Sequence, residues 1–174
     1  MRLSPLYDLL VTELQEIFDA ENQVVVGLST MIKAAQSPDL AEGFEDHLEQ
    51  TQGQIARLEE IAEELEIDLT GQKSAGMAGI IKEGEAAAQM SRSLLRDLLL
   101  ISVAKRVEHY EMARYENART LAEAMEQDYV ADLLQETLDE EESSEQILTE
   151  AVDTIMSDIY EQEADNKMSV AASS

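Results

Sequence analysis

Four long segments of this chain carry apolar residues at every third or fourth position, which is the spacing of one face of an α-helix. They span residues 4–35, 39–65, 91–125 and 129–160, approximately. The chain has only two prolines, and four of its seven glycines fall between Gly71 and Gly84. It therefore lacks the regularly spaced turn residues that an all-β fold needs. The pattern predicts an all-α protein built as a four-helix bundle.

The connections between these segments predict the topology of the bundle. The break around residues 36–39 is short, so the second helix should run antiparallel to the first. Residues 68–79 contain three glycines and little apolar periodicity, and a modest helical patch follows at residues 80–90. We therefore expect a long crossover with a short extra helix between the second and third long helices. One domain over residues 1–163 and a disordered tail over residues 164–174 complete the prediction.

Charge and composition narrow the possible partners and locations. The formal net charge is −26 and cysteine is absent, so disulfides, thiolate metal sites and thiolate catalysis are excluded. Nucleic acids and anionic membranes should be repelled, and metal cations are the expected partners, although a solvated acidic surface also explains such a charge. No apolar stretch is long enough to span a membrane, and no signal-peptide pattern is present. These features predict a cytoplasmic protein.

Each long segment places an ionisable side chain on its apolar face. These residues are Glu21 in the first, His47 in the second, Glu108 and Glu111 in the third, and Glu141 in the fourth. An unpaired buried carboxylate is costly, so several in one core require cations, protons or dense hydrogen bonding. Carboxylates with an imidazole suit iron or manganese. We therefore predict that these five residues hold one or two divalent metal ions.

Some of these residues also fit roles that need no metal. Glu21 can equally pair with a lysine or arginine, and His47 can be a packing histidine that bonds to a neighbour. Glu108 and Glu111 favour binding of a cation, because like charges one turn apart destabilise a helix. The fourth helix offers further acids that compete with Glu141 for the inward position: Glu140, Glu142 and Glu145.

Four more side chains lie close to these candidates in the pattern. His109 is expected to support the ligands or to bond between helices. Tyr115, one turn after Glu111, is expected in the core, with an electron-relay role as the alternative. Thr51 and Gln54 share the face of His47.

Several motifs together carry a resemblance that covers nearly the whole chain. They are Phe18-Asp19-Ala20-Glu21, Phe44-Glu45-Asp46-His47-Leu48-Glu49-Gln50-Thr51 with Arg57-Leu58, Val107-Glu108-His109-Tyr110-Glu111 with Tyr115, and Leu134-Gln135-Glu136-Thr137-Leu138-Asp139-Glu140-Glu141. With them the sequence resembles the YciE/YciF family of stress-associated bacterial proteins in the ferritin-like superfamily. The resemblance implies a ferritin-like bundle, a homodimer and a dinuclear metal centre. It makes Glu21, Glu108 and Glu141 carboxylate ligands, and Glu111 an additional glutamate of the rubrerythrin type.

The chain departs from the ferritin pattern at two imidazole positions. Ferritins and rubrerythrins place Glu-x-x-His on two of the four helices. Here the second helix reads Thr51-x-x-Gln54 with His47 one turn earlier, and Ser144 replaces the histidine of the fourth. The predicted function is metal binding in the bundle core, with oxidation of Fe(II) or consumption of peroxide in a stress response. The alternative is a non-catalytic homodimeric bundle with a degenerate metal site, so enzymatic activity is left open.

Overall fold

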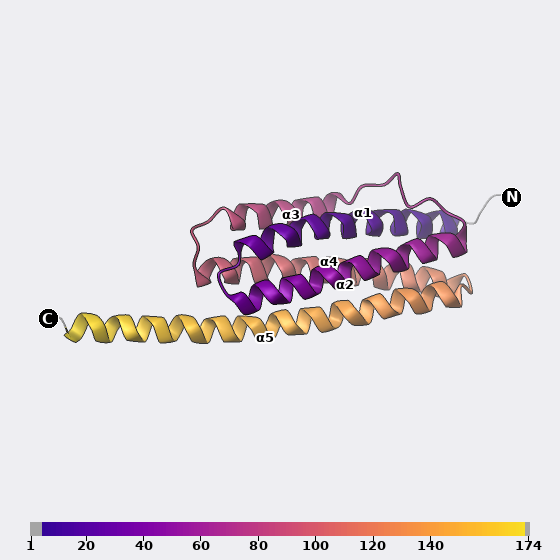
Figure 1. Cartoon of the computed structure of the whole chain (residues 1–174). Helices are drawn as coiled ribbons and strands as arrows, with labels where there is room; N and C mark the ends of the chain where they lie inside the picture. Colours follow the sequence, from indigo (N-terminus) through magenta and orange to yellow (C-terminus); the bar gives the residue numbers. More distant parts are fainter. Residues whose placement is uncertain (1–4, 173–174) are drawn as a thin grey trace.

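The computed structural model describes residues 5–172, which form five α-helices and no strand (Figure 1). The helices are α1 (Pro5–Ala34), α2 (Pro38–Leu65), α3 (Ala75–Ala88), α4 (Leu94–Ala124) and α5 (Asp128–Ala172). None of these helices is long and apolar enough to cross a membrane.

The four long helices form the predicted bundle. α1 runs antiparallel to α2, and α4 runs antiparallel to α5, while α1 contacts α4 and α2 contacts α5 (Figure 1). The short α3 lies in the connection from α2 to α4 and packs on α1 and α4. This arrangement confirms the all-α bundle with a long crossover that carries a short extra helix.

The extra helix begins earlier than the sequence predicts. It starts at Ala75, not at residue 80, because the side chain of Ser74 caps it by accepting a hydrogen bond from the Met77 amide. Gly76 is typical of a loop in the sequence pattern, yet it lies within the helix against Tyr110 of α4. A Cβ at this position would meet Tyr110 Cε2 at 2.6 Å. This glycine therefore serves close helix packing.

The last helix also differs from the predicted end. α5 continues to Ala172 and extends past the end of the bundle (Figure 1), whereas the sequence predicts a disordered tail from residue 164. Residues 161–172 contain no proline or glycine, so nothing in the backbone stops the helix. Residues 173 and 174 of the expected tail lie outside the described residues, and the domain boundary at residue 163 stays a prediction.

The apolar core consists of two clusters at different heights of the bundle. One cluster includes Val24, Leu28, Phe44, Ile101 and Leu148. The other includes Leu14, Ile17, Leu58, Tyr115 and Leu134. Along every long helix, the residues between the two clusters include buried polar side chains. The bundle thus carries a polar layer between two apolar layers.

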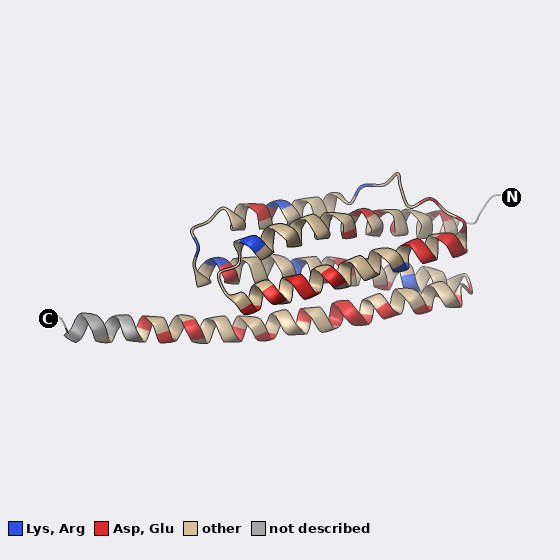
Figure 2. Cartoon of the chain, viewed as in Figure 1, with Lys and Arg blue, Asp and Glu red and all other residues tan. Residues whose placement is uncertain are grey.

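A few side chains do not follow the predicted stripes. Leu6 and Ile147 fall in the apolar repeats of the first and fourth predicted helices, but they are 46% and 60% exposed. Asp97 is charged but buried, and its carboxylate accepts hydrogen bonds from the amides of Gln36 and Ser37, both at 2.8 Å. It thereby fixes the short connection between α1 and α2 to the start of α4. Elsewhere acidic residues outnumber basic ones along the helices (Figure 2).

Candidate metal centre

The polar layer brings together side chains from three of the long helices. One ligand atom from each of His47 on α2, Glu108 and Glu111 on α4, and Glu141 on α5 lies within 4.8 Å of the others. All four residues are buried. Each occupies a position on the apolar stripe of its helix, which turns its side chain inward, and the packing of the helices brings the four to one height.

Most carboxylate oxygens of this layer have no hydrogen-bond partner. Both oxygens of Glu108 and Glu111, and one oxygen each of Glu21 and Glu141, are buried without a partner. A buried polar group left unpaired costs about 1–3 kcal/mol, and more when it is charged. The layer therefore requires bound protons or cations to be stable.

Glu21 lies beside the group of four and is held by a tyrosine. The Tyr115 hydroxyl donates a hydrogen bond of 2.5 Å to Glu21 Oε1, and both residues are fully buried. The other oxygen, Oε2, has no partner. The alternative pairing of Glu21 with a lysine or arginine is not seen among the described residues. Tyr115 is in the core, as predicted, and in direct contact with the acidic layer.

Glu141 is held by an amide that belongs to a wider network. Gln54 Nε2 donates to Glu141 Oε1 at 2.5 Å and to Glu140 Oε2 at 3.1 Å. Arg57 in turn donates to Glu140 and to the Thr137 hydroxyl. The inward acid of α5 is therefore Glu141. Gln54 links it to Glu140, which forms an ion pair with Arg57.

His47 lies at the edge of the group with one nitrogen toward it. Its Nδ1 is 3.3 Å from Glu108 Oε1, while its Nε2 is buried without a partner. The Thr51 hydroxyl donates to the backbone carbonyl of His47 at 2.9 Å, so this hydroxyl hydrogen is used within α2 and not by the ligands. Burial lowers the pKa of His47, which favours the neutral imidazole that a metal needs.

Burial also dominates the titration of the acidic residues. It raises the pKa of Glu21, Glu108 and Glu111 well above the ordinary glutamate value, and the neighbouring carboxylates raise these pKa values further. Burial and the charge of Glu21 also raise the pKa of the Tyr115 hydroxyl. Without a cation, burial and the neighbouring carboxylates therefore favour the protonated form of these glutamates.

One expected supporting residue lies outside the layer. His109 is 63% exposed, and its Nε2 lies 3.8 Å from Glu145 Oε1, beyond hydrogen-bond distance. The expectation that it supports the ligands is wrong, because His109 follows Glu108 by one residue and its side chain is therefore turned by about 100°. Of the alternative, a bond between helices, the structure has this longer contact with Glu145 on α5. Ser144, at the position of the missing histidine, is bonded instead to Gln50 Oε1 at 2.9 Å.

The chemistry of the donor set fits a hard divalent ion. Several carboxylates with one neutral imidazole are ligands typical of iron and manganese in helical bundles. The buried carboxylate oxygens without hydrogen-bond partners support this match between residues and ion, since a cation would bond to them.

Comparison with known proteins places the chain in a family. A family model described as "Domain of unknown function (DUF892)" matches residues 5–164. The chain belongs to the DUF892 family. Protein YciF of Escherichia coli K12 is 34% identical over 152 residues, which cover 86% of this chain and 92% of that protein. The resemblance to the YciE/YciF family is thereby confirmed.

Solved structures agree with this assignment. The crystal structure of the E. coli stress protein YciF matches with a TM-score of 0.85 and 32% identity, covering 89% of this chain and 99% of that one. YcfI, a putative structural protein from Rhodopseudomonas palustris, matches with a TM-score of 0.80 and 34% identity over 85% and 95% of the two chains. A Xanthomonas campestris protein shares the fold at 20% identity, with a TM-score of 0.71 over 91% and 99%.

Proposed function

We propose that this DUF892 protein binds one or two divalent metal ions, iron or manganese, in the polar layer of its bundle. The ligands are Glu108, Glu111, Glu141 and His47, with Glu21 completing the set from α1. The observation that supports this proposal is the group of buried carboxylate oxygens without partners, contributed by separate helices. An ion would neutralise and bond these oxygens at once.

The proposed activity is oxidation of Fe(II) or consumption of peroxide in a stress response, in line with the description of YciF as a stress protein. Bound Fe(II) would supply the electrons for that reaction. The residues of this chain supply the surroundings: the apolar clusters above and below exclude water, and Gln54 fixes the orientation of Glu141. Tyr115 holds Glu21 in place through its hydroxyl hydrogen bond.

A second candidate is a non-catalytic homodimeric bundle whose inward acids are protonated. The observation that favours it is the replacement of the expected helix-borne imidazoles by Gln54 and Ser144, both of which are bonded to protein groups. In this case the layer would hold protons permanently. A homodimer and a cytoplasmic location are part of both proposals.

Metal binding separates these two candidates. The chain is purified without a metal-affinity tag, stripped with chelator, loaded with Fe(II) without oxygen, and analysed for iron bound per chain. Air is then admitted while near-ultraviolet absorption from oxygen-to-iron charge transfer is followed. We expect one or two bound ions and growth of this absorption. A chain that retains no ion from Fe(II) or Mn(II) would contradict the metal centre.

Two variants make the measurement specific to the layer. Glu141→Gln removes an inward carboxylate, and Glu142→Gln makes the same change on the exposed neighbouring residue. We expect the first to lower metal affinity at least about tenfold and the second to leave it unchanged. Equal behaviour of the two would indicate surface binding to the acidic exterior.

A further inference from the structure

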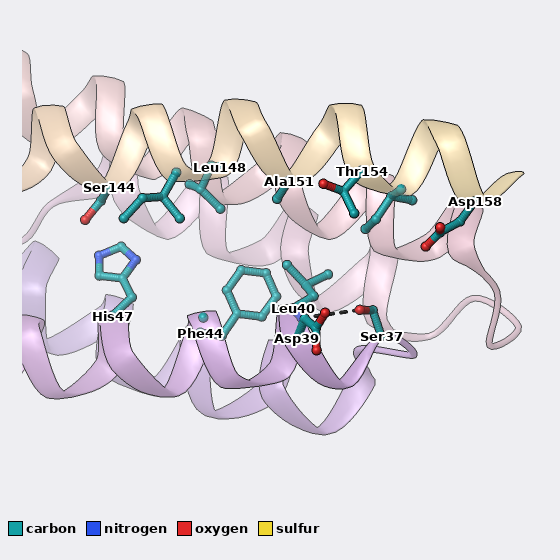
Figure 3. Close-up of a pocket in the computed structure, with 13 residues that line it drawn as sticks. Ser37, Asp39, Leu40, Phe44, His47, Ser144, Leu148, Ala151, Thr154 and Asp158 are labelled. Atoms are coloured by element: carbon teal, nitrogen blue, oxygen red, sulfur yellow. Dashed lines mark hydrogen bonds between the residues drawn. The ribbon is translucent and has the colours of Figure 1, made fainter.

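An apolar cavity of about 220 Å³ lies between α2 and the C-terminal part of α5 (Figure 3). Its walls include Leu40, Phe44, Leu148, Ala151 and Ile155. A cavity of about 150 Å³ with such a lining is enough to hold benzene. The cavity between α2 and α5 therefore has room for a molecule of about six to ten carbon atoms.

One end of the cavity meets the proposed metal centre. His47 lines the cavity and also belongs to the group of four residues in the polar layer. Figure 3 shows its ring turned toward Ser144 on the facing helix. His47 is only 7% exposed, and its Nε2 has no hydrogen-bond partner. Ser144 uses its hydroxyl hydrogen for Gln50, so its oxygen can still accept a bond.

The charges around the cavity select an uncharged ligand. Asp39 and Asp158 stand at the other end of the cavity (Figure 3), where both are exposed, and the buried glutamates lie beyond His47. An anionic head group would be repelled at either end. A cationic head group at the mouth would gain little, because attraction between solvated charges is weak. It would also leave His47 Nε2 without a partner, at a cost of about 1–3 kcal/mol.

We propose that this cavity binds an uncharged aliphatic molecule with a terminal O–H group, of the alcohol or alkyl hydroperoxide class. The chain lies along Phe44 and Leu148, and the O–H group bonds to His47 Nε2 or donates to Ser144 Oγ. Its oxygen accepts from Nε2–H when Nδ1 binds an ion, and its hydrogen is donated to Nε2 when the hydrogen of the metal-free ring is on Nδ1. The cavity is then the substrate site of the proposed metal centre. Its role as a substrate site rests on that proposed function, but the binding itself does not require the metal.

Binding is tested by calorimetric titration of the metal-free chain with octan-1-ol, and with octanoate as the charged counterpart. Gly43 lines the cavity and Gly53 lies further along the same helix, and a Cβ added at either meets open space. Gly43→Leu narrows the cavity, while Gly53→Leu is the matched control. Ala151→Leu narrows the cavity from α5 and provides an independent second variant.

We expect octan-1-ol to bind, and we expect the affinity for octanoate to be lower by at least about tenfold. Gly43→Leu and Ala151→Leu should each weaken octan-1-ol binding about tenfold, the effect of displacing two methylene groups. Gly53→Leu should leave it unchanged. Equal binding of octanoate, or equal effects of Gly43→Leu and Gly53→Leu, would overturn the proposal. The absence of octan-1-ol binding would also overturn it. If sedimentation shows a dimer that Gly43→Leu disrupts and Gly53→Leu does not, the cavity is instead occupied by a second copy of the chain.

Failure of this proposal is distinguishable from failure of the metal centre. Mn(II) binding is measured separately on the same variants, and Gly43→Leu should bind the ion as the unmodified chain does. A chain that binds Mn(II) but no octan-1-ol overturns the cavity proposal alone. A chain that binds octan-1-ol but no metal supports the cavity as a binding site and refutes its role beside a metal.

Discussion

Replacing Glu111 by glutamine should stabilise the metal-free protein and reduce the stabilisation that a bound metal ion adds. Glu111 is 1% exposed, and neither of its oxygens has a hydrogen-bond partner. Its pKa is raised by burial and by the charge of Glu21. In the metal-free chain at pH 8, the neutral amide should therefore stabilise the fold by about 1–3 kcal/mol. This corresponds to an increase of about 2–10 °C in the unfolding midpoint.

The stabilisation that metal adds is expected to be smaller in the variant than in the unmodified chain. An ion present at a hundred times its Kd stabilises the unmodified chain by about 2.7 kcal/mol. Loss of one carboxylate ligand should lower the affinity by about tenfold to a hundredfold, so the same ion concentration should stabilise the variant by only about 0.4–1.4 kcal/mol. The comparison therefore needs both states of the protein.

The assay is urea denaturation at pH 8, once with chelator and once with Mn(II), on Glu111→Gln and on a matched control. Glu116→Gln is the control, because it makes the same change on an exposed residue of α4. It should alter neither stability nor the effect of Mn(II). The reasoning is refuted if Glu111→Gln destabilises the metal-free chain, or if Mn(II) stabilises that variant as much as the unmodified protein.

Three further predictions concern the pH response, the support of the ligands and helix packing. The buried glutamates have raised pKa values in the folded state, so their contribution to the stability of the metal-free chain should be full below about pH 4.5 and be lost as pH rises. The loss should be up to about 1.4 kcal/mol per group and pH unit. Thermal unfolding at pH 5 to 8 would show it. Gln54→Leu removes the donor to Glu141 and should weaken Mn(II) binding about tenfold to a hundredfold by calorimetry; an unchanged affinity would exclude a supporting role. Gly76→Ala should destabilise the chain by about 1–3 kcal/mol, because the added methyl group would meet Tyr110. Gly79→Ala meets open space and should stabilise the chain by up to about 1 kcal/mol. Equal urea midpoints of the two variants would contradict the packing argument.

The architecture could be predicted from the sequence because its signal is repeated many times. Apolar residues mark one face over several turns of every long helix, and a misplaced residue such as the exposed Ile147 does not change the result. The start of α3 was predicted too late, because the packing role of Gly76 depends on Tyr110 from a distant part of the chain. A glycine that breaks a helix and a glycine that lets another helix approach look the same in one sequence.

The candidate site was predictable as a set of faces but not as a set of contacts. Glu108 and Glu111 interrupt an apolar stripe, and this property can be read from one helix alone. The hydrogen bond from Gln54 to Glu141 depends on the relative heights of α2 and α5, which no spacing within a helix determines. The exposure of His109, by contrast, follows from its own helix, because its side chain is turned by about 100° from that of Glu108.

The position of the polar layer explains how such a site can exist without making the fold depend on metal. An apolar cluster lies on each side of the layer, and each includes residues from α1, α2, α4 and α5. Small metal domains without a core of their own unfold when the ion is removed. Here apolar packing on both sides of the layer joins the helices without an ion, and the glutamates can take up protons in its place. The metal-free chain should therefore stay folded, with the layer as its least stable part. This follows from the two clusters and is independent of which metal the layer prefers.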